Sequence, residues 1–253
     1  MEESFGVIDK ALSTIEALAE SNEPLGPTQL AKMLDMNKST VYRILQTLCR
    51  RGYASRDDDG RYTCGAKLVE VASNYINSLE LETEAKPYLV MLYSELGMPV
   101  HLGVLDDMNT VYVEKLDLYS GGPDYARIGY KTPAYCSSIG KCLLAALSGE
   151  ELDKVLYRYR FVAYTPNTIT NPQAFKEHLR TVRAQGWAMD NEEYMLGSCC
   201  VGAPVYDYRG DAVACVSVSG NKEQFSEEKR EILVRKVQQA AGQISRRMGY
   251  VAP

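Results

Sequence analysis

The segment MNKSTVYRILQTLCRRGYASRDDDGRY, residues 36–62, decides how the N-terminal part of the chain folds. Between residues 37 and 56 it contains five basic residues and no acidic residue. The 253-residue chain has a formal net charge of -5, so the five cations of this segment leave -10 for the rest. A basic segment in an acidic protein is typical of a surface that binds an anionic partner.

Apolar residues recur at helical spacing in this segment and in the two stretches before it. The pattern predicts helices over about residues 5–21, over a short stretch that begins at Pro27, and over about residues 38–51. Pro27 suits the first position of a helix, because a backbone N–H there lacks an intrahelical partner. The buried face of the third helix is predicted to consist of four apolar residues: Val41, Ile44, Leu45 and Leu48.

A β-hairpin is predicted directly after Gly52, which ends the third helix. Two stretches suited to strands, about residues 53–56 and 61–64, flank an Asp-Gly turn in the sequence DDDG. Three helices and a hairpin in this order are the plan of a winged helix-turn-helix, whose third helix reads DNA. We therefore expect a DNA-binding domain over residues 1–65, followed by a linker helix over residues 66–79 that also offers a dimer surface.

The outer side of the third helix combines hydroxyl, amide, aromatic and cationic groups. This mixture suits contacts with phosphates and base edges, whereas a charge run alone more often marks a solvated surface. Arg43 is the candidate for reading guanine, and Arg56 and Arg61 straddle the hairpin turn, where they can reach a minor groove or the DNA backbone. The three carboxylates at the tip are expected to stand clear of DNA. The predicted DNA-binding residues are Lys38, Ser39, Thr40, Tyr42, Arg43, Gln46, Arg56 and Arg61.

Composition excludes several other classes of protein. The chain has 45% apolar and 24% charged residues, a composition typical of globular proteins. It has no apolar run long enough to span a membrane. The N-terminus MEESFGVIDK lacks the plan of a secretory signal, so a soluble cytoplasmic protein is expected. The seven cysteines form no C-x-x-C pair, and neither histidine has a cysteine nearby at metal-ligand spacing. We expect free thiols, no metal and no cofactor.

The remainder of the chain mixes helices and strands, which predicts an α+β domain over residues 80–253. Helices are predicted over residues 81–96, interrupted or restarted near Pro87, from the start of SSIGKCLLAAL (137–147), over residues 173–186, and from about Ser226, as the cap, to Met248. Strand pairs are predicted around the turns DDMN (106–109) and DYRG (207–210).

Several motifs follow one another along nearly the whole chain. They are NKSTVYRILQTL with the GY before a short wing, GYKTPAYCSSIGKCLLAAL, GWAMDNEEYMLGSCCVGAPVYDYRGDAVACVSVSG and ISRRMGY. In this order they resemble the IclR family of bacterial transcriptional regulators. The stretches HLGVLDDMNTVYVEKLD and ARIGYKTPAY look most like the KdgR-like branch, whose members regulate sugar-acid breakdown.

The resemblance implies a winged helix-turn-helix domain, a linker helix and a C-terminal GAF-like effector-binding domain, assembled as a dimer or a dimer of dimers. Family members typically bind small carboxylates (keto acids, sugar acids or aromatic acids), which alter their grip on a double-stranded operator, and most are repressors. Matching positions in the family assign acid binding to six residues: Ser138, Ile139, Asp190, Cys200, Ser217 and Ser219.

The chemistry of these residues fits an acid site in part. Ser138 and Ile139 lie at a predicted helix start, where free N–H groups attract anions. Ser217 and Ser219 leave one face of a strand together, which is equally the pattern of a solvent-facing side. Asp190 is either a solvated loop acid or, beside a carboxylate ligand, a group that accepts from a ligand hydroxyl or is protonated.

Residues next to these six keep two interpretations. Lys141 lies near the site or faces solvent, and Glu192 and Glu193 are expected to cap or pair locally. The segment DLYSGGPDYARIG (117–129) is a lid or a plain loop. Further side chains expected around the pocket are Tyr125, Tyr130, Tyr135, Tyr194, Cys136, Cys142 and Cys199. Of these, Tyr130, Tyr135 and Tyr194 either offer hydroxyls to the ligand or are core aromatics.

Three functions compete on this sequence. The first is a ligand-controlled transcription factor without enzymatic activity. The second is a small-molecule hydrolase with Cys200 as nucleophile, fused to a DNA-binding module, but no motif links either histidine to that cysteine. The third, an architectural DNA binder, leaves the large second domain without a role. We expect the first.

Overall fold

The computed structural model describes residues 6–77, 80–117 and 127–251. The chain divides into two compact units, residues 1–79 and 80–253, which are described separately. Positions 118–126 of the glycine-containing segment, and with them Tyr125, lie outside the described residues. Within the described ranges no helix is both long and apolar enough to cross a membrane.

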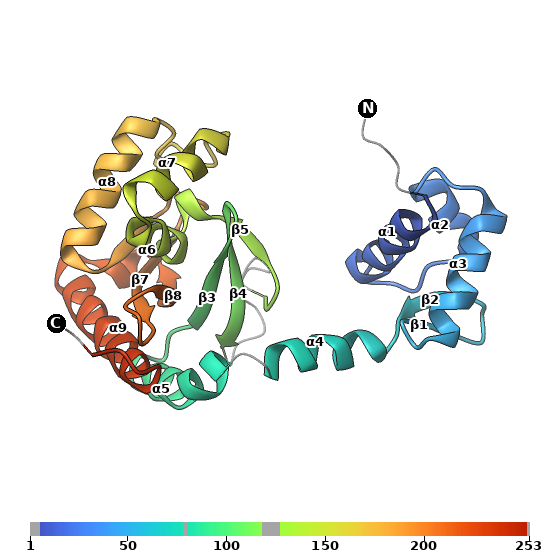
Figure 1. Cartoon of the computed structure of the whole chain (residues 1–253), viewed down its shortest axis with the longest axis horizontal. Coiled ribbons are helices and arrows are strands. Elements are labelled where there is room, and N and C mark those ends of the chain that lie inside the picture. Colours follow the sequence, from blue (N-terminus) through green and yellow to red (C-terminus); the bar gives the residue numbers. More distant parts are fainter. Residues whose placement is uncertain (1–5, 78–79, 118–126, 252–253) are drawn as a thin grey trace. The chain divides into compact units, whose positions relative to one another are not determined.

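Helices and a hairpin make up the N-terminal unit (Figure 1). In chain order its elements are α1 (Val7–Glu20), α2 (Pro27–Met33), α3 (Lys38–Arg50), β1 (Ala54–Arg56), β2 (Tyr62–Cys64) and α4 (Lys67–Asn77). Pro27 occupies the first turn of α2, and Gly52 follows α3 with a φ of +78°, which glycine adopts without strain. The predicted winged helix-turn-helix is confirmed.

The hydrophobic core of this unit fixes how α3 is presented. Val41 and Leu45 of α3 are fully buried, and Ile44 and Leu48 are buried beside them, as predicted. The hairpin is held by a β-bridge in which Leu25 and Tyr62 exchange backbone N–H···O bonds of 2.9 Å. The apolar side of α3 is therefore fully used in the core, and its polar side is free for other contacts.

The C-terminal unit is an α+β domain. Its elements in chain order are α5 (Glu80–Leu96), β3 (Val100–Asp106), β4 (Asn109–Leu116), β5 (Lys131–Pro133), a 3-10 turn (Ala134–Cys136), α6 (Ser138–Ala146), α7 (Gly149–Arg158), α8 (Pro172–Gln185), β6 (Ala188–Asn191), β7 (Ser198–Tyr206), β8 (Ala212–Asn221), a second 3-10 turn (Lys222–Phe225) and α9 (Glu227–Arg247).

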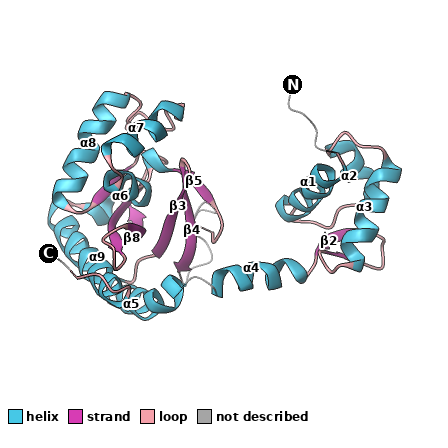
Figure 2. Ribbon diagram, viewed as in Figure 1, coloured by secondary structure: helices cyan, strands magenta, loops and turns pink. Residues whose placement is uncertain are grey.

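An antiparallel sheet, magenta in Figure 2, separates two layers of helices in this unit. Among the described residues the strand order is β5-β4-β3-β8-β7-β6. Helices α5 and α9 pack on one face, where Val100, Leu102 and Val216 are fully buried. Helix α6 packs on the other face, with α8 behind it. The residue that starts α6 thus lies directly against the sheet.

Glycines let α6 approach its surroundings closely. A Cβ atom added at Gly140 of α6 would lie 2.3 Å from the Cα atom of Ala134. A Cβ atom added at Gly202 of β7 would lie 2.9 Å from the Cys215 sulfur and 3.3 Å from the Ser138 hydroxyl. Side chains at these positions would push the N-terminus of α6 away from the strands.

One predicted helix break is absent. Helix α5 continues through Pro87, although proline removes one backbone hydrogen bond. Ala85, Leu89 and Leu92 are buried on either side of it, and α5 packs along α9. Tertiary packing therefore holds the helix together where local propensity predicted an interruption.

Helix α7, strands β5 and β6 and the two 3-10 turns were not predicted, and one cap differs. Helix α7 begins with a capping box in which Ser148 accepts from the Glu151 N–H. Strand β6 is short and carries Asp190, which the acid-rich sequence placed in a loop. Ser226 is the N-cap residue of α9, as predicted, but its side chain makes no capping hydrogen bond.

Candidate effector pocket and DNA interface

A small pocket lies where the N-terminus of α6 meets the sheet. Its volume is about 20 Å³, room for about one water molecule, so a carboxylic acid must widen it. All six residues predicted to bind the effector line it. The full lining is His101, Tyr112, Thr132, Ser137, Ser138, Ile139, Asp190, Tyr194, Cys200, Ser217 and Ser219.

Strand register explains why residues distant in sequence meet here. Asp190 pairs with Cys200, and Cys200 pairs with Ser219, so these three form one row across β6, β7 and β8. Ser217 pairs with His101 in the next row. Directly paired residues point to the same face of a sheet, and so do residues two apart on a strand. The serine side of β8 thus faces α6 rather than solvent, and Ser217 is 2% exposed.

The start of α6 supplies a positive helix end to the pocket. Ser137 is the N-cap residue, and its hydroxyl accepts from the Gly140 N–H at 2.9 Å. The same hydroxyl lies 2.8 Å from that of Thr110 on β4. Ser138 and Ile139 in the first turn are buried against the strands. Backbone N–H groups at a helix start attract anions, so this end of the pocket suits a carboxylate.

Asp190 is a buried acid and not a solvated one. It is 5% exposed, and its Oδ1 accepts from the Glu193 backbone N–H at 2.7 Å. Desolvation raises the pKa of its carboxyl group to about 7, against the opposing effect of Lys141. Both protonation states are therefore populated near neutral pH, and the group can donate to an acid as well as accept from a hydroxyl.

Lys141, Glu192 and Glu193 form ion pairs with residues that are distant in sequence. Lys141 is fully buried, and its ammonium group donates to the backbone carbonyl of Met189 and to Glu193. Glu192 pairs with Lys222. Both glutamates also accept from nearby backbone N–H groups, as expected: Glu192 from Gly197 at 2.8 Å and Glu193 from Asn191 at 3.4 Å. Their ion-pair partners, 30 or more positions away, were not expected. Lys141 does not face solvent.

Four pocket residues were missed by the sequence reasoning: His101, Tyr112, Thr132 and Ser137. His101 is 3% exposed and Thr132 is 1% exposed, and both line the pocket. Burial, reinforced by Lys115, lowers the pKa of His101 to about 4, so its imidazole is neutral at physiological pH. A polar residue inside the apolar run VHLGVLD was the available signal for His101.

The remaining candidates divide between core and pocket. Tyr135 is a core residue whose hydroxyl donates to the Val162 carbonyl at 2.9 Å. Tyr194 lines the pocket, and its hydroxyl lies 3.5 Å from that of Tyr130. Three buried thiols lie outside the pocket lining: Cys136, Cys142 and Cys199.

Cys200 lacks the surroundings of a nucleophile. Desolvation raises the pKa of its thiol well above the usual range, whereas a catalytic cysteine needs a lowered one. His101 shares the pocket but lies on β3, two strands from β7. Two strand spacings put their Cα atoms about 10 Å apart, too far for a direct thiol–imidazole hydrogen bond. No cluster of three potential metal-binding side chains occurs in the described ranges.

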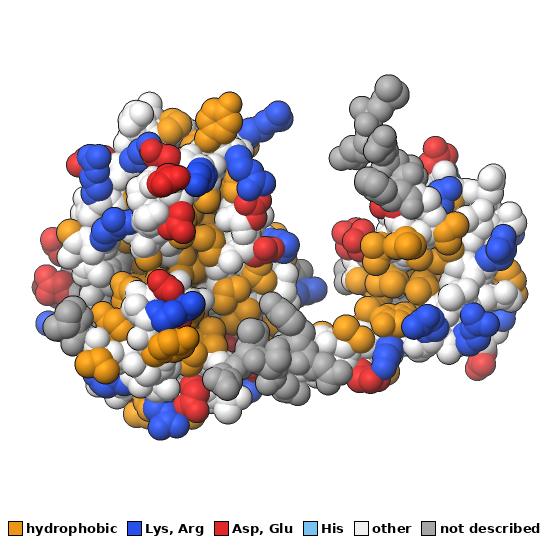
Figure 3. All heavy atoms as spheres, in the orientation of Figure 1, with side chains coloured by type: hydrophobic (Ala, Val, Ile, Leu, Met, Phe, Trp, Pro, Cys, Tyr) orange, Lys and Arg blue, Asp and Glu red, His pale blue; other side chains and the backbone are white. Residues whose placement is uncertain are grey.

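The predicted DNA-binding residues lie on the outer side of the N-terminal unit. Figure 3 shows Lys and Arg side chains gathered along the edge formed by α3 and the hairpin. Of the eight predicted residues, Thr40 is half-buried and the following seven are exposed: Lys38, Ser39, Tyr42, Arg43, Gln46, Arg56 and Arg61. The exposed face of α3 is thus the polar and cationic one.

Two grooves run along the exposed face of α3. One, of about 440 Å³, lies toward α1 and is lined by Thr40 and Arg43. The other, of about 470 Å³, lies toward the hairpin and is lined by Tyr42, Arg50 and Arg56. Arg50, at the end of α3, is not among the eight predicted residues. Its place in the second groove makes it a further candidate for phosphate contact.

The hairpin tip uses one of its carboxylates internally. Asp57 accepts from the Arg61 N–H at 2.8 Å, and Gly60 closes the turn with a φ of +76°. The guanidinium group of Arg56 lies over the Tyr62 ring, 5.9 Å from its centroid. Arg56 is therefore held along the arm of the hairpin, on the side of α3.

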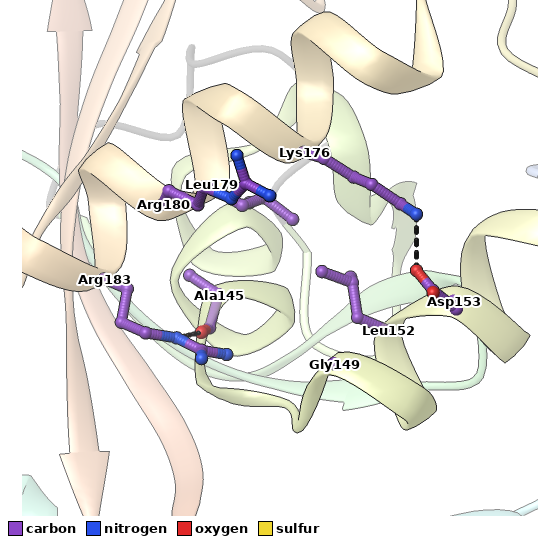
Figure 4. Close-up of a pocket in the computed structure, with 8 residues that line it drawn as sticks. All are labelled: Ala145, Gly149, Leu152, Asp153, Lys176, Leu179, Arg180 and Arg183. Carbon is purple, nitrogen blue, oxygen red and sulfur yellow. Dashed lines mark hydrogen bonds and ion pairs between the residues drawn. The ribbon is translucent and has the colours of Figure 1, made fainter.

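A hollow of about 250 Å³, larger than the effector pocket, lies between α6, α7 and α8 (Figure 4). Its basic groups are engaged with neighbours: Arg183 donates to the Ala145 carbonyl at 2.5 Å, and Lys176 lies 2.5 Å from Asp153. Arg180 pairs with Glu177 at 2.6 Å. The bonds of Arg183 and Lys176 join α8 to α6 and to α7, so the hollow is a site of packing between three helices.

Sequence and structure comparisons agree on a family. The IclR helix-turn-helix domain profile matches residues 7–58, and the profile described as "Bacterial transcriptional regulator IclR C-terminal" matches residues 73–246. XynR of Escherichia coli is 32% identical over 97% of this chain and 98% of that protein. KdgR of Escherichia coli is 34% identical over 98% of this chain and 94% of that protein. Both are named HTH-type transcriptional regulators.

Solved structures extend the likeness to the whole fold. The Thermotoga maritima IclR structure covers 98% of this chain and 100% of that one, with 33% identity and a TM-score of 0.86. An IclR homolog from Microbacterium hydrocarbonoxydans, solved with 4-hydroxybenzoate, covers 96% of this chain and 99% of that one. Its TM-score is 0.85 at 20% identity, which shows the shared fold alone. The chain belongs to the IclR family of bacterial transcriptional regulators.

Proposed function

We propose that this regulator is a repressor whose affinity for its operator is controlled by a small carboxylic acid. The acid, a keto acid or a sugar acid, binds in the pocket under α6. One observation carries the proposal. The six residues that the family resemblance assigned to acid binding, drawn from α6, β6, β7 and β8, line a single pocket.

The chemistry of the pocket supports an acid. A carboxylate at the start of α6 gains the helix N–H groups, and the hydroxyls of Ser217 and Ser219 can donate to it. Asp190 can offer its proton, since its pKa of about 7 leaves much of it neutral at physiological pH. The start of α6 and the sheet together thus present donors on several sides.

Relatives support the repressor role and the acid class. Relatives named "Transcriptional repressor IclR" from Escherichia coli and "Acetate operon repressor" from Salmonella typhimurium are 32% and 30% identical to this chain. The Microbacterium structure holds an aromatic acid in the same overall fold. Each name applies to the protein that bears it, and the transfer to this chain is our proposal.

We assign residues 1–65 to DNA binding, residues 66–79 to a linker helix and residues 80–253 to effector binding. Exposed residues of α3 and the hairpin arms contact the operator: Lys38, Ser39, Tyr42, Arg43, Gln46, Arg56 and Arg61, with the half-buried Thr40 at the edge of the α1 groove. Exposed apolar side chains support self-association as a dimer or a dimer of dimers: Val7, Ile8 and Leu12 of α1, and Val69 and Val71 of α4.

A thermal-shift screen tests the effector class. Ligands that bind the folded state raise the melting temperature, so at least one keto acid, sugar acid or aromatic acid should do so in a concentration-dependent way. The corresponding neutral amides are the control, because they lack the carboxylate that α6 attracts. A screen in which no acid raises the melting temperature contradicts the proposal.

A further inference from the structure

Two buried polar atoms without a partner line the effector pocket. Among the described residues, four buried side-chain atoms make no hydrogen bond: His101 Nε2, Thr132 Oγ1, His178 Nε2 and Glu193 Oε2. The first two belong to pocket residues. A buried polar group without a partner costs free energy, so such groups in a pocket point to a partner that arrives with the ligand.

Both residues lie on the half of the sheet away from Asp190. His101 is on β3 and Thr132 is on β5, whereas Asp190 and Cys200 are on β6 and β7 at the other edge. None of the six residues assigned to acid binding lies on β3, β4 or β5. The pocket therefore has a second polar end that the acid-binding residues leave unexplained.

The chemistry of this end suits a hydroxyl group. The imidazole of His101 is neutral, and each neutral ring nitrogen either donates or accepts. A hydroxyl can donate or accept, so one hydroxyl group satisfies His101 Nε2 in either tautomer and a second one satisfies Thr132 Oγ1. The two residues lie on β3 and β5, two strands apart, so each needs a hydroxyl of its own. A second carboxylate can only accept, and it would bring another buried charge close to an uncharged ring.

We propose that His101 and Thr132 form a subsite in which each residue binds a hydroxyl group of the effector, distant from its carboxylate. The inference rests on the proposed function, because it takes the carboxylate to be held at the α6 end. It makes the effector a hydroxylated carboxylic acid and assigns selectivity to two residues outside the acid-binding set.

Thr132 has a neighbour that serves as a matched comparison. Thr110 lies directly opposite it on β4 and is equally buried, but the Thr110 hydroxyl has a partner in Ser137. Thr110→Val should lower the melting temperature because it breaks a buried hydrogen bond. Thr132→Val removes a hydroxyl without a partner and should leave the melting temperature unchanged or higher. An equal loss in both variants would show that Thr132 is bonded within the protein, which overturns the inference.

Selectivity is measured by calorimetry on the full chain with acids that differ in hydroxyl groups. The probes are butyrate and 4-hydroxybutyrate, hexanoate and gluconate, and benzoate and 4-hydroxybenzoate. Wild type should bind the hydroxylated member of at least one pair about tenfold or more tightly, the value of one well-made buried hydrogen bond. In Thr132→Val this preference should fall toward one, while affinity for the other member stays unchanged.

Conservative and independent variants complete the test. Thr132→Ser keeps the hydroxyl and should retain the preference. His101→Leu should lower the affinity for gluconate, which can offer a hydroxyl to each residue, and leave the affinity for hexanoate unchanged. Equal binding of both members of every pair by wild type, or an undiminished preference in Thr132→Val, overturns the subsite and leaves the acid-binding function standing. Failure of wild type to bind any of the six acids overturns the subsite, and the thermal-shift screen then decides separately whether the acid-binding function stands.

Discussion

Lys141 and Glu193, 52 positions apart, form an ion pair inside the C-terminal unit, with side chains 0% and 6% exposed. Their charged atoms lie 2.5 Å apart. The pair joins the first turns of α6 to the turn that follows β6. The pair adjoins the pocket on two sides. The Glu193 backbone N–H donates to the pocket residue Asp190, and Lys141 lies in the helix that begins with the pocket residues Ser138 and Ile139.

Removal of one member of this pair should destabilise the C-terminal unit strongly. Lys141→Met leaves the Glu193 carboxylate buried without its counter-charge, which costs about 3–5 kcal/mol. Urea unfolding followed by fluorescence measures the effect, since the single tryptophan, Trp187, packs against the core of this unit.

The control for that variant is a solvent-exposed pair of the same kind. Lys154 pairs with Glu150 on α7, where both side chains are more than 70% exposed. Lys154→Met should change the free energy of unfolding by less than about 0.5 kcal/mol. Similar losses in the two variants would contradict a special role for the buried pair.

Asp190 and His101 should give opposite pH dependences of stability. The pKa of Asp190 is raised from 3.8 to about 7 on folding, so its contribution is present below pH 3.8 and is lost as the pH rises to about 7. The pKa of His101 is lowered from 6.5 to about 4, so its contribution is present above pH 6.5 and is lost as the pH falls toward 4.

Melting temperatures between pH 4 and 7 measure both slopes. Asp190→Asn should remove a contribution to stability that declines as the pH rises. The melting temperature of this variant should therefore rise more steeply with pH than that of wild type. His101→Gln should remove a contribution to stability that increases as the pH rises. The melting temperature of this variant should therefore rise less steeply with pH than that of wild type. Parallel curves for all three proteins would mean that neither group titrates differently in the folded state.

Arg43 should carry operator selectivity. Arg43→Ala is expected to weaken binding to the selected operator by about 1–3 kcal/mol while non-specific binding changes little. Arg51→Ala is the matched control, because Arg51 caps the end of the same helix and lies outside both grooves. Fluorescence anisotropy with operator and scrambled duplexes separates specific from non-specific binding. Equal selectivity in both variants would refute the assignment of Arg43.

Much of the N-terminal unit followed from sequence because its signals are local. The spacing of Val41 and Leu45, the position of Pro27 and the Asp-Gly turn each specify structure within a few residues. Strand β6 gave no such signal, since its acids resemble a solvated loop. The burial of Asp190 depends on pairing with Cys200, and that pairing is decided by the whole sheet.

The pocket shows the same division. The family resemblance supplied six of its residues, and periodicity correctly put Ser217 and Ser219 on one face of a strand. It could not tell which face is covered, because α6 packs there through non-local contacts at Gly202. His101 and Thr132 were missed for the same reason, since single polar residues in apolar strands become informative once their neighbours are known.

The most direct measurement is the operator affinity of wild type and of Ser217→Ala/Ser219→Ala, with and without the acid that raises the melting temperature. The operator is the genomic fragment that the protein itself selects, and anisotropy gives the dissociation constants. The account predicts that the acid shifts the wild-type constant at least tenfold and leaves that of the double variant unchanged, with equal DNA affinity of the two proteins in its absence. An identical acid-induced shift in both proteins would contradict it.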